Sequence, residues 1–257
     1  MTNPIQNYER IRARLSALIA RQQSEPAKRL LESVLAQTGQ QTRFAVANPV
    51  TGHPSIPQRD YDVQQLRRQA EKRAYNTDHH FYVAVLDIDK FNNFNNTYGH
   101  DVGNLVLLAS NDILRDSIRT YDTLGKSYHL HGEEKSLIFQ APNDQTACLI
   151  ADRCRRNIKE QSPSVTVTPR YPLGFSITES IGLTRWNIHS EDFATAEQRA
   201  DSACNLAKGR QPGTKDEPYE GRDRVIFLSP DTTLSHLEKF TNMLPRKPQL
   251  TATQPAS

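Results

Sequence analysis

The strongest constraint on this chain is an apolar run that ends directly in carboxylates. The run is Phe81-Tyr82-Val83-Ala84-Val85-Leu86, and Asp87-Ile88-Asp89 follows it without a break. A continuous apolar run predicts a strand buried on both faces, because a half-exposed strand alternates apolar and polar residues. The chain should therefore build a sheet around this strand, with carboxylates at one end of it.

The remaining patterns place this strand in an alternating order of helices and strands. Helices are expected at about 60–76, 102–119, 144–160 and 191–208, and strands near 127–131, 134–140, 173–185 and 224–228. The two short strands form a hairpin around Gly132. The βαββαβ order is the ferredoxin-like, or palm, pattern. We therefore predict an α/β (α+β) fold with a mixed, largely antiparallel sheet flanked by helices.

This domain should span 44–229, after a helical extension at 1–43. Aliphatic residues recur at helical spacing in two segments, Ile11, Leu15, Leu18 and Ile19 in the first and Leu30, Leu31, Val34 and Leu35 in the second. Aliphatic stripes without Trp or Phe predict packing against the domain or against a second copy of the chain. We expect the second of these, a homodimer. A basic membrane-surface helix is the alternative. The polar tail, 230–257, is expected to be largely disordered.

Composition limits the compartment and the partners. The net charge is only +3, which gives no reason to expect a nucleic-acid partner. No stretch approaches the ~20 apolar residues that span a bilayer, and the N-terminus lacks an apolar signal segment. The three cysteines suit neither a zinc site nor a disulfide framework and are expected to be free thiols. We expect a soluble, cytoplasmic protein without a membrane partner.

Three groups of polar residues are candidates for chemistry. Asp87 and Asp89 at a strand end are placed to bind Mg²⁺, which prefers oxygen ligands shared with phosphates, although such pairs also cap turns. Glu133 and Glu134 occupy the hairpin turn, where acids also occur simply as solvated loop residues. Lys208 ends the last helix, where it could reach a triphosphate or complement the helix dipole. In a palm fold, the first two groups would converge on one metal site.

At these residues the chain resembles the GGDEF family of diguanylate cyclases. The segment Asp87–Asn104 matches the family pattern DxDxFKxxNDxxGHxxGD in spacing without a gap. Asn48–Gly52 resembles the opening DxLTG, and residues 131–135, HGEEK, stand in the place of GG(D/E)EF. Ser180–Leu183 resembles the SxG strand, and Phe193–Lys208 the final helix. The resemblance covers about 48–227 and implies a domain that binds a nucleoside triphosphate and magnesium.

Carried over by position, the resemblance implies a role for each matching residue. Those implied to hold Mg²⁺ or Mn²⁺ are Asp87, Glu133 and the carbonyl of Ile88, with Glu134 beside the reacting centre. Those implied to bind substrate are Lys90, Phe91 and Asn92 at the phosphates, Asn95 and Asn104 at the base, and Lys208 and Arg222 at the triphosphate. Residues 212–220 look inserted before Arg222.

The chain also departs from the family pattern. The departures are Asn92 for a phosphate-side Lys, Asn96 and Asn104 for Asp, His129 for Arg, His131 for Gly and Lys135 for Phe. They point to altered substrate choice or to partial decay. Arg119 and Asp122 resemble the RxxD product-inhibition site, although they lie about three residues farther from the signature than in the family.

Three functions fit this sequence. The first is an enzyme that joins two nucleotides, GTP and possibly ATP, into a cyclic dinucleotide such as cyclic di-GMP. The second is a degenerate nucleotide-binding module that passes a signal through its N-terminal helices. The third is a relative of the CRISPR-type cyclic-oligonucleotide polymerases. Asp87 and Glu133 favour the first and third, and the altered signature favours the second.

Overall fold

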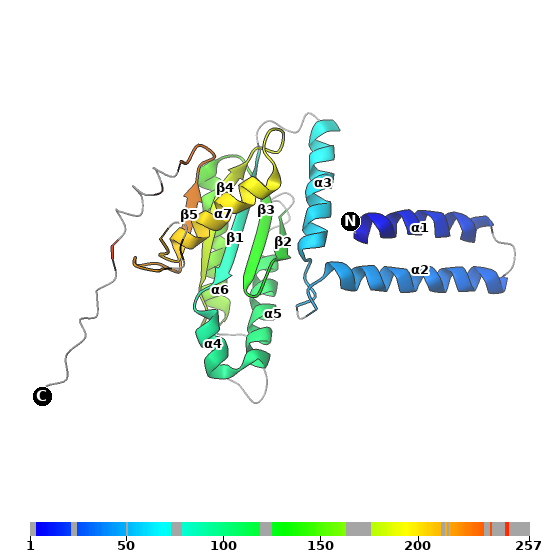
Figure 1. The fold of residues 1–257 in the computed structure, drawn as a ribbon, viewed down its shortest axis with the longest axis horizontal. Helices are drawn as coiled ribbons and strands as arrows, with labels where there is room; N and C mark the ends of the chain where they lie inside the picture. The colour runs from blue at the N-terminus through cyan, green and yellow to red at the C-terminus, as the bar shows by residue number, and fades with distance from the viewer. Residues whose placement is uncertain are drawn as a thin grey trace, which may run out of the picture.

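A computed structural model describes residues 4–21, 25–49, 51–72, 79–118, 125–162, 176–211, 214, 216–233, 237 and 245–246. Its elements are α1 (Pro4–Arg21), α2 (Glu25–Val46), α3 (Ile56–Lys72), β1 (His80–Ile88), α4 (Phe91–Tyr98), α5 (His100–Ser117), β2 (Lys126–His129), β3 (Glu134–Ala141), α6 (Asp144–Gln161), β4 (Glu179–Trp186), α7 (Phe193–Ala207) and β5 (Val225–Leu228). The five strands form one sheet in the order β2-β3-β1-β4-β5 (Figure 1). β1 is antiparallel to both neighbours, and β5 is parallel to β4. The predicted mixed α/β fold is confirmed.

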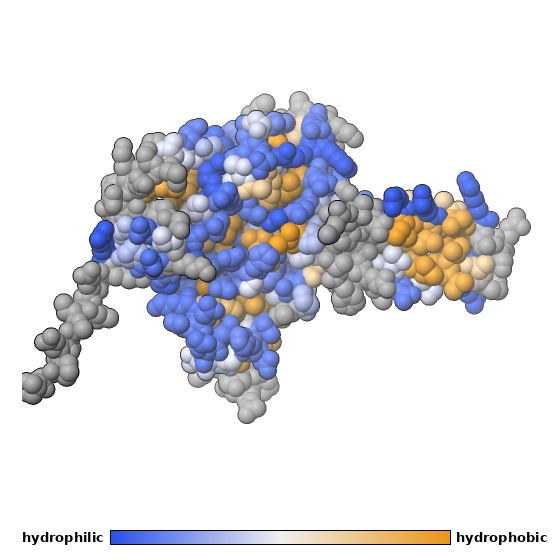
Figure 2. Space-filling model, viewed as in Figure 1, coloured by the Kyte–Doolittle hydropathy of each residue, from blue (hydrophilic) through white to orange (hydrophobic). Residues whose placement is uncertain are grey.

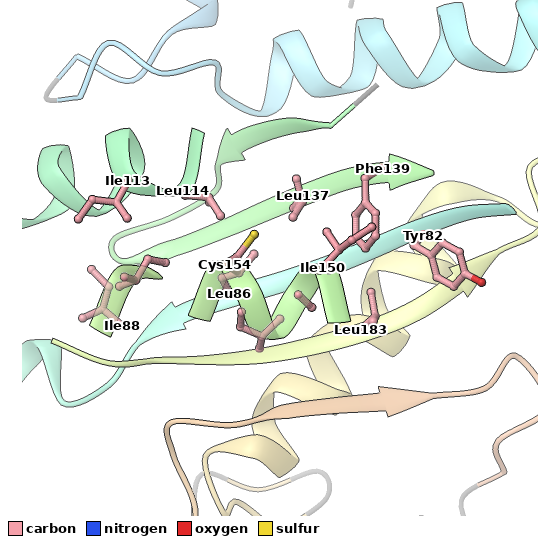
Figure 3. Packing of buried hydrophobic residues seen from close by; sticks show 14 of the residues in the cluster. Tyr82, Leu86, Ile88, Ile113, Leu114, Leu137, Phe139, Ile150, Cys154 and Leu183 are labelled. Atoms are coloured by element: carbon pink, nitrogen blue, oxygen red, sulfur yellow. The ribbon is translucent and has the colours of Figure 1, made fainter. Parts of the chain in front are cut away.

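Strand β1 is the apolar run of the sequence, and it is covered on both faces. Tyr82, Leu86 and Ile88 point into a core under α5 and α6, where Figure 3 shows them beside side chains from β3, β4 and α6. Val83 and Val85 point into a second core, which α3 and α7 cover. Because side chains alternate along a strand, Val85 and Asp87 on either side of Leu86 face the layer opposite to that of Leu86.

The segment after β1 differs from the prediction, because two helices replace the single helix expected at 102–119. Helix α4 precedes α5, and Gly99, with φ 87°, separates them. The Asn-rich sequence of α4 has weak helix propensity, but Phe91 is buried in the main core. A Cβ at Gly103 would overlap the side chain of Asn95, so a glycine there lets α5 lie close to α4. Tertiary packing, rather than sequence periodicity, forms this helix.

Helix α7 lies unusually close to β4. A Cβ at Gly182 would overlap the backbone of α7 at Ala200 and Cys204, and Ala200 and Ala203 on the facing side of the helix are fully buried. Asp192 caps the start of α7 by accepting from the backbone N–H of Thr195 at 2.8 Å. This close contact brings the end of the helix to the end of β1.

Helices α1 and α2 form a hairpin that projects away from the sheet (Figure 1). The hydroxyl of Tyr61 in α3 donates to Glu9 in α1 at 2.6 Å and ties the hairpin to the domain. Leu18, Leu30 and Val34 remain 54%, 66% and 41% exposed, and Figure 2 shows apolar surface gathered on this hairpin. Among the described residues, none of the helices has the length and apolarity needed to cross a membrane.

The C-terminal tail lies mainly outside the described residues. Within the described part, Arg246 pairs with Tyr219 in an isolated β-bridge, and the N–H of Glu220 donates to the carbonyl of Pro245 at 2.8 Å. The three cysteines are free thiols, and two of them, Cys154 and Cys204, are buried.

Candidate nucleotide and metal site

Asp87, near the end of β1, is a buried carboxylate with one paired and one open oxygen. Its Oδ2 forms an ion pair with Nζ of Lys208. Its Oδ1 has no hydrogen-bond partner within the part of the chain that the structure describes. A buried carboxylate oxygen without a partner is costly. This unpaired oxygen is therefore suited to bind a ligand that enters the site.

The hairpin turn brings a second carboxylate opposite the first. In the register of β1 and β3, Asp87 pairs directly with Glu134. Gly132, with φ 54°, and the hydrogen bond from the N–H of Glu134 to the carbonyl of His131 close the turn. Glu133, one residue earlier, is partly exposed in the turn itself. The structure thus brings Asp87 together with Glu134, which faces it across the ladder, and Glu133 is the adjacent residue of the turn.

Negative charge accumulates at this end of the sheet. Burial raises the pKa of Glu134, the charges of Asp87 and Asp201 raise it further, and Lys208 opposes them. Asp201 lies seven residues before Lys208 on the same face of α7, and burial raises its pKa as well. Asp201 was not among the predicted site residues. Its spacing of seven residues from Lys208 could have indicated it, because residues seven apart share a face of a helix.

The donor set fits a magnesium ion that is held partly by substrate. In the described part of the chain, no three His, Cys, Asp or Glu side chains are grouped so that they could hold a metal by themselves. Mg²⁺ is usually bound through one or two carboxylates, with water and phosphates completing its shell. The unpaired oxygen of Asp87 and a carboxylate of the facing turn, Glu133 or Glu134, could supply those one or two carboxylates.

The other acid of the strand end, Asp89, has a structural role. Its Oδ1 accepts from the hydroxyl of Ser180 at 2.7 Å, and its Oδ2 accepts from the hydroxyl of Thr178 at 2.7 Å and from the N–H of Asp223 at 3.0 Å. These bonds join the end of β1 to the start of β4 and to the segments that precede β4 and β5. Of the two aspartates in Asp87-Ile88-Asp89, only Asp87 is free to bind a ligand.

The residues on either side of the insertion before Arg222 meet. A Cβ at Gly221 would overlap the backbone of Gly209 and Lys208, so these flanking residues lie in contact. The N–H of Arg222 donates to the carbonyl of Ala207 at 2.6 Å. The insertion therefore returns Arg222 to the end of α7, beside Lys208. The guanidinium of Arg222 pairs with Glu217 at 2.5 Å.

The turn between β1 and α4 lies beside Arg222, with which it lines a cavity. Lys90 has φ 58°, in the left-handed region, and stands just before the first residue of α4. The first N–H groups of a helix lack partners within it and favour phosphate oxygens. A cavity of about 500 Å³ adjoins the turn and is lined by residues of this turn, the outer face of α4 and the segments before β4 and β5, among them Lys90, Asn93, Tyr98, Thr178 and Arg222.

The two predicted base-binding residues lie on neighbouring helices. Asn95 is on α4 against Gly103, and its buried Oδ1 has no hydrogen-bond partner among the described residues. Asn104 is exposed in the first turns of α5, and Asn92 is exposed at the start of α4. The predicted inhibitory pair, Arg119 and Asp122, lies outside the described residues.

These features define the class of protein as a palm-like α/β domain with facing carboxylates and a buried lysine at the end of its central strand. The comparisons with known proteins identify the family. The sequence model described as "Diguanylate cyclase, GGDEF domain" matches residues 51–213, and the chain belongs to this family. The predicted family is thereby confirmed.

Relatives of known name and structure agree with this assignment. The chain is 30% identical to diguanylate cyclase A of Treponema denticola over 56% of its own length and 34% of that protein. It is 28% identical to the diguanylate cyclase DgcZ of Escherichia coli, over 73% of its own length and 55% of that protein. The chain thus spans between about a third and about half of these relatives. The coiled coil and GGDEF domain of DgcB from Caulobacter crescentus, solved with c-di-GMP, superpose with a TM-score of 0.63 at 20% identity, covering 79% and 96% of the two chains.

The raised pKa of Glu134 leads to a stability prediction. A carboxyl whose folded pKa is raised favours the fold when protonated, and this stabilisation is lost as pH rises from the ordinary pKa through the raised one. Glu134→Gln should therefore raise the melting temperature near neutral pH by about 1–3 °C in the presence of a chelator. The difference should vanish below about pH 4, near the ordinary carboxyl pKa.

Thermal unfolding followed by circular dichroism across this pH range provides the measurement. Glu160→Gln, at an exposed position of α6, is the matched control and should change the melting temperature little. A Glu134→Gln variant that melts below the wild type at neutral pH would contradict the crowding of charge described above.

Proposed function

We propose that this chain is a nucleotidyltransferase that condenses two nucleoside triphosphates into a cyclic dinucleotide, with two GTP molecules giving cyclic di-GMP. The observation that carries the proposal is the cross-strand pair of Asp87 and Glu134, with an open carboxylate oxygen beside a buried lysine. Membership of the GGDEF family supports the reaction class, and the named relatives are diguanylate cyclases.

The residues at the end of the sheet would have different roles in the reaction. Asp87, the carbonyl of Ile88 and Glu133 would hold Mg²⁺ or Mn²⁺, which supplies charge neutralisation and alignment of the phosphates. Glu134, whose pKa is raised by burial, is placed to accept the proton of the attacking 3′-hydroxyl. The new bond forms between that oxygen and the α-phosphorus of the second nucleotide, and the bond to pyrophosphate breaks.

Binding of the triphosphate requires a change of partner at Lys208. In the structure its ammonium group neutralises Asp87. Lys208 would turn from Asp87 toward the β- and γ-phosphates, beside Arg222, once Asp87 served as a metal ligand. The N–H groups at Lys90, Phe91 and Asn92 would cover the same phosphates. Positioning and fixed charges would supply most of the rate.

The carboxylates should be required for catalysis. Asp87→Asn and Glu133→Gln keep the size of each side chain but remove the charge that a metal needs, so product formation should fall by about a hundredfold or more. The measurement is incubation with all four nucleoside triphosphates and Mg²⁺ or Mn²⁺, with products identified by mass spectrometry. Asp231→Asn, at an exposed position, is the control. Wild-type rates in either site variant would refute the metal assignment.

A second candidate function is a nucleotide-binding signalling module without catalysis. It is favoured by the altered signature, in which His131 and Lys135 replace Gly and Phe of the family pattern. A third is the synthesis of longer cyclic oligonucleotides. The same incubation separates the three, because a module would bind a nucleotide without forming product, and an oligonucleotide synthase would give products heavier than a dinucleotide.

Asn104 should weaken the preference for guanine. A carboxylate there would accept from guanine N1–H and its amino group, whereas the amide of Asn104 offers one acceptor and one donor. The same amide suits the N6–H and N1 of adenine. Loss of a charge-assisted bond costs about 1–3 kcal/mol, which is about ten- to hundredfold in preference. We therefore expect ATP to be accepted detectably, with some guanine bias kept by Asn95.

Competition between GTP and ATP at equal concentration measures this preference. Asn104→Asp should restore selectivity for GTP, and Asn92→Asp, which changes an exposed residue at the phosphate end, should not raise it. Strict use of GTP by the wild type, unchanged in Asn104→Asp, would mean that this position does not contact the base.

A homodimer should be required, since each site would hold one nucleotide. The exposed Leu30 and Val34 on α2 are the proposed contact. Because burying an aliphatic side chain is worth about 1.5–3 kcal/mol, Leu30→Glu with Val34→Glu should weaken association at least about tenfold and lower specific activity at nanomolar protein. Sedimentation and activity across protein concentration test this. Ser33→Glu, exposed on the same helix, is the control. A monomeric variant with full activity would exclude the proposed dimer.

A further inference from the structure

Lys135 follows the two glutamates of the hairpin turn, yet its side chain lies inside the protein. It is 0% exposed. In the ladder with β1 it pairs with Leu86, one position from the pair of Asp87 and Glu134. Since alternate residues of a strand face opposite sides, Lys135 points away from the metal site and into the layer under α5. The lysine therefore does not reach a phosphate at the site.

Two other buried residues meet the ammonium group. Nζ of Lys135 forms an ion pair with Oε1 of Glu179, which is also 0% exposed, and donates to the hydroxyl of Ser110 at 2.5 Å. The hydroxyl of Ser110 in turn donates to the same oxygen of Glu179. Lys135, Ser110 and Glu179 thus form a closed triad, with each member bonded to the other two.

The triad joins the three segments that carry the proposed site. Lys135 is in β3, directly after Glu134. Ser110 is in α5, the helix that carries Asn104. Glu179 begins β4 and precedes Ser180, whose hydroxyl holds Asp89 at the end of β1. The buried ammonium group of Lys135 therefore links the hairpin turn at 131–135, helix α5 and, through Glu179 and Ser180, the loop that follows Asp87.

The triad is matched in charge, and Oε1 of Glu179 accepts from both of its partners, while Oε2 has no hydrogen-bond partner among the described residues. A buried charge without a counter-charge is strongly unfavourable, and removal of one partner from a buried pair destabilises far more than removal of both. The chain places a carboxylate and a hydroxyl where the unusual lysine needs them.

We propose that Lys135, Ser110 and Glu179 are positioning residues, which hold the turn carboxylates Glu133 and Glu134 in a fixed position relative to β1 and α5. The catalytic consequence rests on the proposed function, but the positioning itself does not. The triad replaces the apolar anchor that the family pattern has at position 135, and it makes the geometry of Glu133 and Glu134 depend on a buried ion pair.

Three variants of the full chain test the triad. Lys135→Met removes the cation, Glu179→Gln removes the anion while keeping its shape, and the double variant removes both charges. Arg199→Met is the matched control, because it breaks another largely buried ion pair, that of Arg199 with Glu191, which lies at the other end of β4. All are compared at a temperature at which circular dichroism shows them folded. If Lys135→Met does not fold, Glu179→Gln and the double variant carry the test.

The first readout is backbone amide hydrogen exchange of residues 131–135 without nucleotide. We expect exchange about tenfold faster in each single variant and within about threefold of the wild type in the double variant and in the control. The second readout is steady-state kinetics. The single variants should lose about tenfold in kcat with little change in KM, because the triad aligns the carboxylates and does not touch substrate.

Each outcome decides the proposal. Unchanged exchange at the turn in the folded single variants overturns it, and so does a double variant that is as defective as the worse single variant. A wild-type protein that makes no product under any condition refutes the proposed function alone. In that case the exchange experiment still decides whether the triad positions the turn.

Discussion

The pairing of β1 between β3 and β4 is the constraint on which the rest of the molecule depends. It buries β1 on both faces, and it fixes which residue of each neighbour stands beside Asp87. Glu134 is opposite on one side and Ser180 on the other. A shift of one residue would turn the carboxylates into the core and the apolar residues toward the site. The site is therefore a product of strand register and not of the turn sequence alone.

Two buried ion pairs follow from this alternation, one on each face of the sheet at the same end. Asp87 pairs with Lys208 on the face that α7 covers, and Lys135 pairs with Glu179 on the face that α5 covers. Each pair leaves one carboxylate oxygen without a hydrogen-bond partner among the described residues, Oδ1 of Asp87 in the first and Oε2 of Glu179 in the second. The second pair differs in that Ser110 bonds to both charged groups, which suits it to remain fixed. A site that rearranges on binding needs such a fixed support beside it.

The sequence was most informative where one local signal determined the structure. The apolar run predicted β1, and the two short strands around Gly132 were found as β2 and β3. Helix α4 was missed because its eight residues owe their conformation to the burial of Phe91 and to the missing side chain at Gly103. The return of Arg222 to the end of α7 depends on contact between Gly209 and Gly221, which the spacing of the chain does not reveal.

Some departures from the family pattern are exposed and others are buried. This difference bears on whether the site has kept its function. Asn92, Asn104 and His131 are exposed, so their replacement alters what a ligand meets and costs the fold little. Lys135 and His129 are buried. At Lys135 the change is compensated by a carboxylate and a hydroxyl from two distant segments, whereas Nδ1 of His129 has no hydrogen-bond partner among the described residues. Sequence reading could identify Lys135 as a departure, but could not identify Glu179 and Ser110 as its partners, since they lie 44 and 25 residues away along the chain. Asp87, Glu133 and Glu134, the carboxylates of the proposed site, are all present beside the rebuilt contact at Lys135. This combination is consistent with the proposed enzyme and its changed substrate contacts.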